Sequence, residues 1–183
     1  APEIISVLKR AGLRFDLVTG YLDDPLAWTE IYEWINATVV YHKMFNNRLG
    51  ILGHYYGGML DVYTDVTKQS AVFGTQIEIL EMCELKALRD AVTEEEIDEK
   101  ILEFRNAFKV DARCDEKELV RAACTSVALD KLVQSHGLGS MAYYYEGFAG
   151  NDYENIVTSV IAGNTLLTGK GIPVAGECEV KNV

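Results

Sequence analysis

The chain has 183 residues, of which 49% are hydrophobic and 25% charged, and its formal net charge is −11. This composition is typical of a globular protein with a real core, and its length suits one α/β domain spanning 1–183. The acidic surface argues against a nucleic-acid partner and against anionic membranes, because like charges repel. The sequence shows neither an apolar run long enough to span a bilayer nor a signal peptide.

The first elements are predicted from hydrophobic spacing and capping residues. Residues 2–11 have helical spacing with Gly12 as a stop, and residues 13–20 alternate like a strand. An Asp cap and a proline in the first turn open a helix over 23–47. The short apolar run at 48–55 predicts a buried strand.

The middle of the chain continues the alternation. A helix is predicted over 57–74 and a strand over 75–82. Thr93 and Glu96 form a capping box at the start of a helix over 93–110, because each side chain can bond the other's backbone amide.

The last elements complete the pattern. We predict a helix over 114–137, a strand over 138–147, a helix with a loop over 151–171 and a strand over 171–177. Strands that alternate with helices indicate an α/β fold, with a mainly parallel Rossmann-like sheet and helices on both faces.

Ligands in such folds bind beyond the carboxyl ends of the strands. His54, in "GHYYGGM", follows one predicted strand; it is either a base, a metal ligand or a plain turn residue. The glycines there suit a tight turn, or amides that approach an anion or a sugar hydroxyl. Of the three consecutive tyrosines 143–145, only alternate members are expected to reach one pocket. Tyr145 is the pocket candidate because it lies nearest the strand end.

Glu177 is the sharpest candidate. It follows a buried strand and the small residues Ala175 and Gly176. A carboxylate at that position can hold a divalent metal or move a proton.

The four cysteines are widely spread and form no CxxC pair. They predict reduced thiols in a cytoplasmic protein rather than a zinc site. They are Cys83, Cys114, Cys124 and Cys178.

Several stretches resemble the central region of the L-arabinose isomerase family, within the arabinose/fucose isomerase superfamily. They include "RLGILGHYYGGMLDVYTDVTKQSAVFGTQIEIL", "TSVALDKLVQSHGLGSMAYYYEG" and "GIPVAGECEVKN". The last resembles the family motif A-G-E-G-D-W-K. The matching positions are Ala175, Gly176, Glu177 and Lys181, and the departures are Cys178, Glu179 and Val180.

The resemblance implies the second domain of a longer, metal-dependent aldose–ketose isomerase, with N- and C-terminal domains absent here. Its Mn²⁺ would be held by two glutamates and two histidines, with Glu177 as the first glutamate and the other ligands beyond Val183. Glu177 would also move a proton through an enediol between L-arabinose and L-ribulose. Met59 and Tyr145 would contact the sugar, and His54 is carried with them as a substrate-binding candidate.

The resemblance further implies a homo-oligomer whose pockets are shared between subunits. With one of four metal ligands, the isolated chain is expected to be inactive and to bind Mn²⁺ weakly. The alternatives are a stand-alone sugar-binding or regulatory α/β domain without catalysis, and a purely structural piece.

Overall fold

The computed structural model describes residues 2–183. They separate into two compact units, with the division between Lys43 and Met44. The predicted strands from 48 onward lie in the second unit, and so do all four strands that form. The α/β architecture is therefore a property of residues 44–183. The prediction of a single domain across 1–183 stays a prediction.

The first unit contains α1 (Pro2–Arg10) and most of α2 (Pro25–Phe45). Helix α1 stops as predicted: Gly12 has φ +69°, and the Leu13 amide donates to the Leu8 carbonyl over 3.1 Å. Of the residues in these two helices, Ala27 alone is buried.

The prediction of a strand over 13–20 is wrong. This segment has no regular structure, and no other strand lies within the described residues 2–43. An alternating sequence becomes a strand only when a neighbour takes its backbone hydrogen bonds. Here the segment is held by a side chain instead, since the Trp34 indole N–H donates to Asp16 Oδ2 over 2.9 Å.

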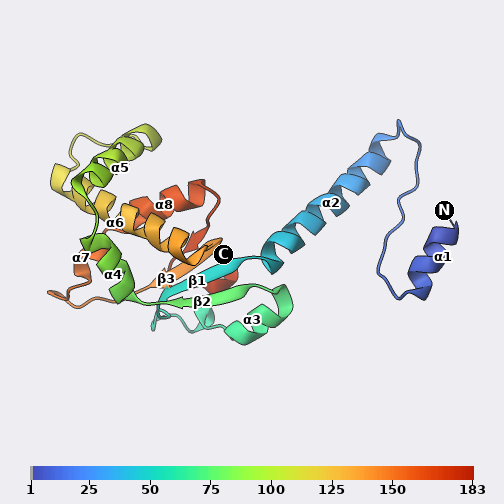
Figure 1. Ribbon diagram of the computed structural model, residues 1–183, viewed down its shortest axis with the longest axis horizontal. Helices are drawn as coiled ribbons and strands as arrows, with labels where there is room; N and C mark the ends of the chain where they lie inside the picture. Colours follow the sequence, from blue (N-terminus) through green and yellow to red (C-terminus); the bar gives the residue numbers. More distant parts are fainter. Residues whose placement is uncertain (1) are drawn as a thin grey trace. The chain divides into compact units, whose positions relative to one another are not determined.

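The second unit is built on a parallel sheet, which confirms the predicted α/β fold class (Figure 1). The strand order is β2-β1-β3-β4, and every neighbouring pair is parallel. The strands are β1 (Arg48–Gly53), β2 (Gln76–Leu80), β3 (Ser140–Tyr144) and β4 (Val174–Ala175). Because the chain order reverses between β1 and β3, their carboxyl ends form the switch point at which such sheets bind ligands.

Helices connect the strands and cover the sheet. They are η1 (Leu60–Val62), α3 (Val66–Phe73), α4 (Met82–Asp90), α5 (Glu94–Ala107), α6 (Glu116–His136), α7 (Glu154–Val157), α8 (Ile161–Gly169) and η2 (Val180–Asn182). In Figure 1, α4, α6 and α8 lie on one side of the strands and α3 on the other. No helix among residues 2–183 is long and apolar enough to cross a membrane.

The capping box at Thr93 and Glu96 is present as predicted. Two helix predictions need correction. The helix expected over 57–74 begins only at Val66, where Asp65 accepts hydrogen bonds from two first-turn amides; the preceding glycine pair disfavours helix. Helix α4, between β2 and the capping box, was not predicted because its nine residues follow the strand directly.

Alternation along the strands divides the core between the two faces. Leu49 and Ile51 pack on the α3 side, while Leu52 packs with the helices on the other face. Gly50 allows close packing there, since a Cβ at this position would lie 2.7 Å from Leu138 and 2.8 Å from Leu80. The sheet is thereby held rigidly beneath the loops at its carboxyl edge.

Candidate functional site

Three loops meet at the carboxyl edge of the sheet, after β1, β3 and β4. The His54 amide donates to the Tyr144 carbonyl over 2.9 Å, and the Tyr56 amide donates to the Glu177 carbonyl over 3.3 Å. The Cys178 amide donates to the Tyr143 carbonyl over 3.0 Å. These backbone bonds join segments far apart in the sequence into one rim.

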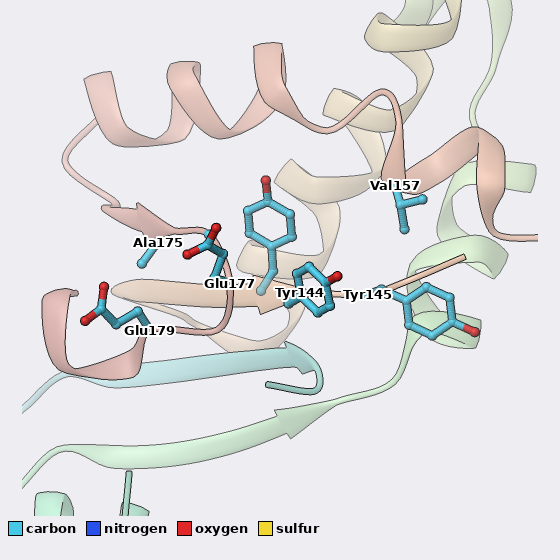
Figure 2. Close-up of a pocket in the computed structure, with 8 residues that line it drawn as sticks. Tyr144, Tyr145, Val157, Ala175, Glu177 and Glu179 are labelled. Atoms are coloured by element: carbon cyan, nitrogen blue, oxygen red, sulfur yellow. The ribbon is translucent and has the colours of Figure 1, made fainter. Parts of the chain in front are cut away.

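A pocket of about 480 Å³ opens at this rim. Figure 2 shows Tyr144 and Tyr145 at the end of β3, with Glu177 and Glu179 on the segment that follows β4. The lining residues are Tyr143, Tyr144, Tyr145, Val157, Ala175, Gly176, Glu177 and Glu179. The pocket is therefore aromatic on one side and acidic on the other.

The backbone at Glu177 turns sharply. Glu177 and Cys178 have φ values of +57° and +62°, the left-handed region that non-glycine residues seldom adopt. The turn buries Cys178 and leaves Glu177 exposed in the pocket. Among the described residues, no side chain forms an ion pair or hydrogen bond with the Glu177 carboxylate. Strained, unpaired groups of this kind are a reason to consider function.

The three consecutive tyrosines all line the pocket, so the expectation that only alternate members reach it is wrong. Tyr143 and Tyr144 do face opposite sides of the sheet, but β3 ends at Tyr144 and the pocket wraps around the strand end. Tyr145 packs edge-on against Tyr153, with ring centroids 5.4 Å apart. Tyr145 thus lies in the pocket together with Glu177, where the strand-end argument expects both.

His54 lies beside these rings rather than among the residues that line the pocket. Its ring centroid is 5.5 Å from that of Tyr144 and 5.9 Å from that of Tyr145. Its Nδ1 is 2.8 Å from the Tyr55 carbonyl oxygen. Because a carbonyl only accepts, Nδ1 carries the proton in this contact and Nε2 is the nitrogen available to a ligand.

Met59 is placed differently. It is partly buried at the start of η1, and its amide donates to the Tyr56 carbonyl over 3.3 Å. It does not line the pocket that contains Glu177. The structure therefore brings Glu177 and Tyr145 together, with His54 adjacent, but leaves Met59 outside this group.

The electrostatics of the rim disfavour additional negative charge. Burial raises the pKa of the Tyr144 phenol, and the nearby charges of Glu146 and Glu177 add to the increase. Burial also raises the pKa of the Cys178 thiol to about 11. Both groups are neutral at pH 7.

The residue types of the pocket only partly fit a divalent cation. Carboxylate oxygens are the ligands that Mn²⁺ accepts, and the pocket has two such residues, Glu177 and Glu179. Across residues 2–183, however, no group of three or more His, Cys, Asp or Glu side chains is arranged to hold a metal. These residues could supply part of a coordination shell of about six ligands, but not a complete one.

Reasoning from the sequence missed Glu179, Tyr144 and Val157 as lining residues. A signal for Glu179 was present, since it stands two positions from Glu177 at an acidic position of the quoted motif. Val157 could not be found in this way, because it reaches the pocket from α7, which is distant in sequence.

No family model matches the chain. It is 24% identical to L-arabinose isomerase 2 of Bacillus licheniformis over 139 residues, which is 73% of this chain and 29% of that protein. It is 25% identical to an L-arabinose isomerase of Bifidobacterium longum over 134 residues, covering 72% and 26% of the two chains. For an L-arabinose isomerase of a Nocardioides species, the values are 26% identity over 110 residues, 60% and 22%.

The chain thus spans between a fifth and a third of the length of these curated relatives. The resemblance predicted from the sequence is confirmed: over 60–73% of its residues, this chain is similar to a part of the L-arabinose isomerases.

Proposed function

We propose that this chain is part of an aldose–ketose isomerase that converts L-arabinose to L-ribulose. The observation that supports it most is the position of Glu177. This residue matches the glutamate of the quoted motif, and it lies unpaired in a pocket at the carboxyl edge of the sheet. The similarity to four curated L-arabinose isomerases supports the reaction class.

In the proposed reaction, the Glu177 carboxylate removes the proton from C2 of the open-chain sugar. The electrons of the broken C–H bond form the C1–C2 double bond of an enediol, and the carbonyl oxygen gains a proton. Return of a proton to C1 and loss of the C2 hydroxyl proton give the ketose. Tyr145 would pack against the carbon chain of the sugar, and His54 would offer Nε2 to a hydroxyl. Met59 would contact the sugar only if the loop after β1 moved.

Mn²⁺ is the cofactor we propose. Glu177 would supply one oxygen ligand, and the remaining ligands would come from outside the described residues. When bound, such a cation polarises the carbonyl and hydroxyl oxygens of a sugar. We further propose that the active form is a homo-oligomer with pockets shared between subunits. We also propose a cytoplasmic location, which the four free cysteines support.

The test is sugar isomerisation by the full-length protein with Mn²⁺, measured as L-ribulose formed from L-arabinose. Glu177→Gln should lower kcat by roughly a hundredfold or more, because the amide cannot accept the proton. Glu116→Gln, on the exposed start of α6, is the matched control and should leave kcat unchanged. Residues 1–183 alone should be inactive. Full activity of the Glu177→Gln variant would show that this carboxylate is not the base.

A second candidate function is a sugar-binding or regulatory domain without catalysis. The lining of the cleft supports it, because aromatic rings and an unpaired carboxylate can bind a sugar without a metal. It predicts that L-arabinose binds to the full-length protein without Mn²⁺ and that no L-ribulose appears. The isomerisation assay and a binding titration without metal therefore separate the two functions.

A further inference from the structure

A second pocket, of about 300 Å³, adjoins the one that contains Glu177. Tyr143 and Gly176 line both pockets, so the two form neighbouring parts of one cleft. The remaining lining residues of the second pocket come from α8 and β4, and none of them is charged. The cleft is thus acidic near Glu177 and neutral further on.

Asn164 of α8 lines this second pocket and is 92% buried. Its backbone is fully used: the amide donates to the Val160 carbonyl over 2.9 Å, and its carbonyl accepts from the Thr168 hydroxyl over 2.9 Å. Its side chain is not, since neither Oδ1 nor Nδ2 has a hydrogen-bond partner among the described residues. A buried amide without partners destabilises a fold, and native structures contain few of them.

The surroundings of Asn164 offer it only one weak polar contact. Burial raises the pKa of the Tyr143 phenol, and the Asn164 side chain opposes that increase through a contact that falls short of hydrogen-bond geometry at both amide atoms. Thr165 and Thr168 donate their hydroxyl protons to helix carbonyls, each over 2.9 Å. These hydroxyls keep acceptor capacity only, and the unpaired Asn164 amide offers one donor group and one acceptor.

A sugar hydroxyl matches this set, because it donates and accepts at once and carries no charge. A carboxylate or phosphate does not match it, because no lysine, arginine or histidine lines the pocket. The two amide atoms are covered by neighbouring atoms, so a ligand can reach them only if the side chain rotates toward the pocket. That rotation gives up only the weak contact with Tyr143, because neither amide atom has a hydrogen-bond partner of good geometry.

We propose that the second pocket binds the hydroxyl-bearing tail of the sugar chain and that Asn164 hydrogen-bonds to a hydroxyl there. The carbonyl end of the sugar then lies beside Glu177. The inference rests on the proposed function for the identity of the ligand as a sugar. It adds a specificity-determining residue on α8, an element that carries none of the sequence-predicted site residues.

The test is the affinity of the full-length protein for L-arabinitol, a five-carbon polyol that cannot be isomerised, measured by calorimetry. Glycerol serves as the short ligand that cannot extend through both pockets. Asn164→Leu should weaken L-arabinitol binding roughly tenfold or more and leave glycerol binding unchanged. The same variant should raise the midpoint of thermal unfolding in the absence of ligand, because it removes an unpaired buried amide.

Ser126→Ala is the matched control. Ser126 also has a buried hydroxyl without a hydrogen-bond partner among the described residues, but it lines neither pocket. Ser126→Ala should raise the unfolding midpoint without changing L-arabinitol affinity. If Asn164→Leu fails to fold, Asn164→Ser and Asn164→Ala provide the comparison, with the serine variant retaining more affinity.

L-arabinitol affinity that is the same in the Asn164 variants and the wild type would overturn the inference, as would the absence of L-arabinitol binding to the wild type. A buried water that satisfies the amide would give the first of these results. L-ribulose formation, measured in parallel, distinguishes the two proposals. If the protein forms L-ribulose but its L-arabinitol affinity does not depend on Asn164, only the inference about the second pocket is wrong. If the affinity depends on Asn164 but no L-ribulose forms, only the proposed reaction is wrong.

Discussion

Two polar clusters in residues 44–183 differ in whether their buried or charged groups have partners within the chain. Lys100, on α5, is buried, and its ammonium contacts Glu103 at 2.5 Å and Asp130 at 2.6 Å. Lys170 contacts Glu103 at 2.9 Å. In the cleft at the sheet edge, by contrast, the carboxylate of Glu177 has no partner among the described residues, and the amide of Asn164 has only a weak contact with Tyr143.

The pKa values reflect the same difference. Burial alone would lower the pKa of Lys100, but its hydrogen bonds to Asp130 and Glu103 outweigh that effect and raise it. Burial alone would raise the pKa of Glu103, but Lys100 and Lys170 lower it. The first cluster fixes α5 against α6 and the end of α8, whereas the second leaves the Glu177 carboxylate without a partner in the chain.

The largest expected effect on stability comes from a substitution in the backbone turn beside the cleft. Gly53 ends β1 with φ +87°, and a Cβ there would collide with the Tyr144 carbonyl oxygen. Gly53→Ala should lower the free energy of unfolding by about 2–4 kcal/mol, measured by denaturant titration. Gly57→Ala is the control, because its φ is not positive and its Cβ would meet no atom within 4 Å. Equal stabilities of the two variants would contradict this account of the rim.

The next effect concerns the satisfied cluster. Lys100→Met should lower the free energy of unfolding by about 1–2 kcal/mol. The loss is moderated because Glu103 and Asp130 are about a third exposed and Lys170 still faces both. Lys109→Met removes an exposed lysine just beyond α5 and should cause no measurable change. A Lys100→Met variant as stable as the wild type would mean that the ion pairs do not hold α5 in place.

A smaller effect depends on pH. His136, at the end of α6, lies 2.7 Å from Glu84 and 3.2 Å from Glu78, contacts that raise its pKa above the ordinary 6.5. The protonated ring therefore stabilises the fold below about pH 6.5, and that contribution is lost as the pH rises through the raised pKa. His136→Gln should cost about 0.5–1 kcal/mol at pH 6 and less at pH 9, by denaturant titration at both values. A cost that is independent of pH would show that the ring acts through packing alone.

The smallest expected effect on stability is that of Glu177→Gln, the substitution expected to lower kcat most. Glu177→Gln keeps the size of an exposed side chain that has no partner to lose. Its unfolding midpoint should match that of the wild type, measured by differential scanning calorimetry. A clear fall in that midpoint would place Glu177 among the structural groups, together with Lys100.

Local rules predicted much of this fold because its signals are local. The capping box of α5, the glycine after α6 with φ +60° and the apolar cores of β1, β2 and β3 depend on residues adjacent in sequence. The strand prediction over 13–20 was wrong for the opposite reason. A strand depends on a neighbouring strand, and alternation within one segment does not reveal whether such a neighbour exists. Helix α4 was not predicted because nine residues show little hydrophobic periodicity.

The candidate site divides in the same way. The rule that ligands bind at strand carboxyl ends predicts from the sequence alone that Glu177, Tyr145 and His54 lie near one another. It could not place Asn164, whose role depends on hydrogen bonds that it does not make. Nor could it show that Met59 lies outside the pocket of Glu177, because the path of the chain after Gly57 and Gly58 is set by tertiary contacts.

The left-handed turn at Glu177 and Cys178 also supplies a chemical reporter of the rim. Cys178 follows Glu177 in the chain and is fully buried, and with a pKa of about 11 its thiolate is scarce near neutral pH. Alkylating reagents should therefore modify the exposed Cys83 and Cys114 first. Labelling of Cys178 would record each opening of the turn, and protection of that thiol by a sugar would reveal an occupied cleft without any measurement of turnover.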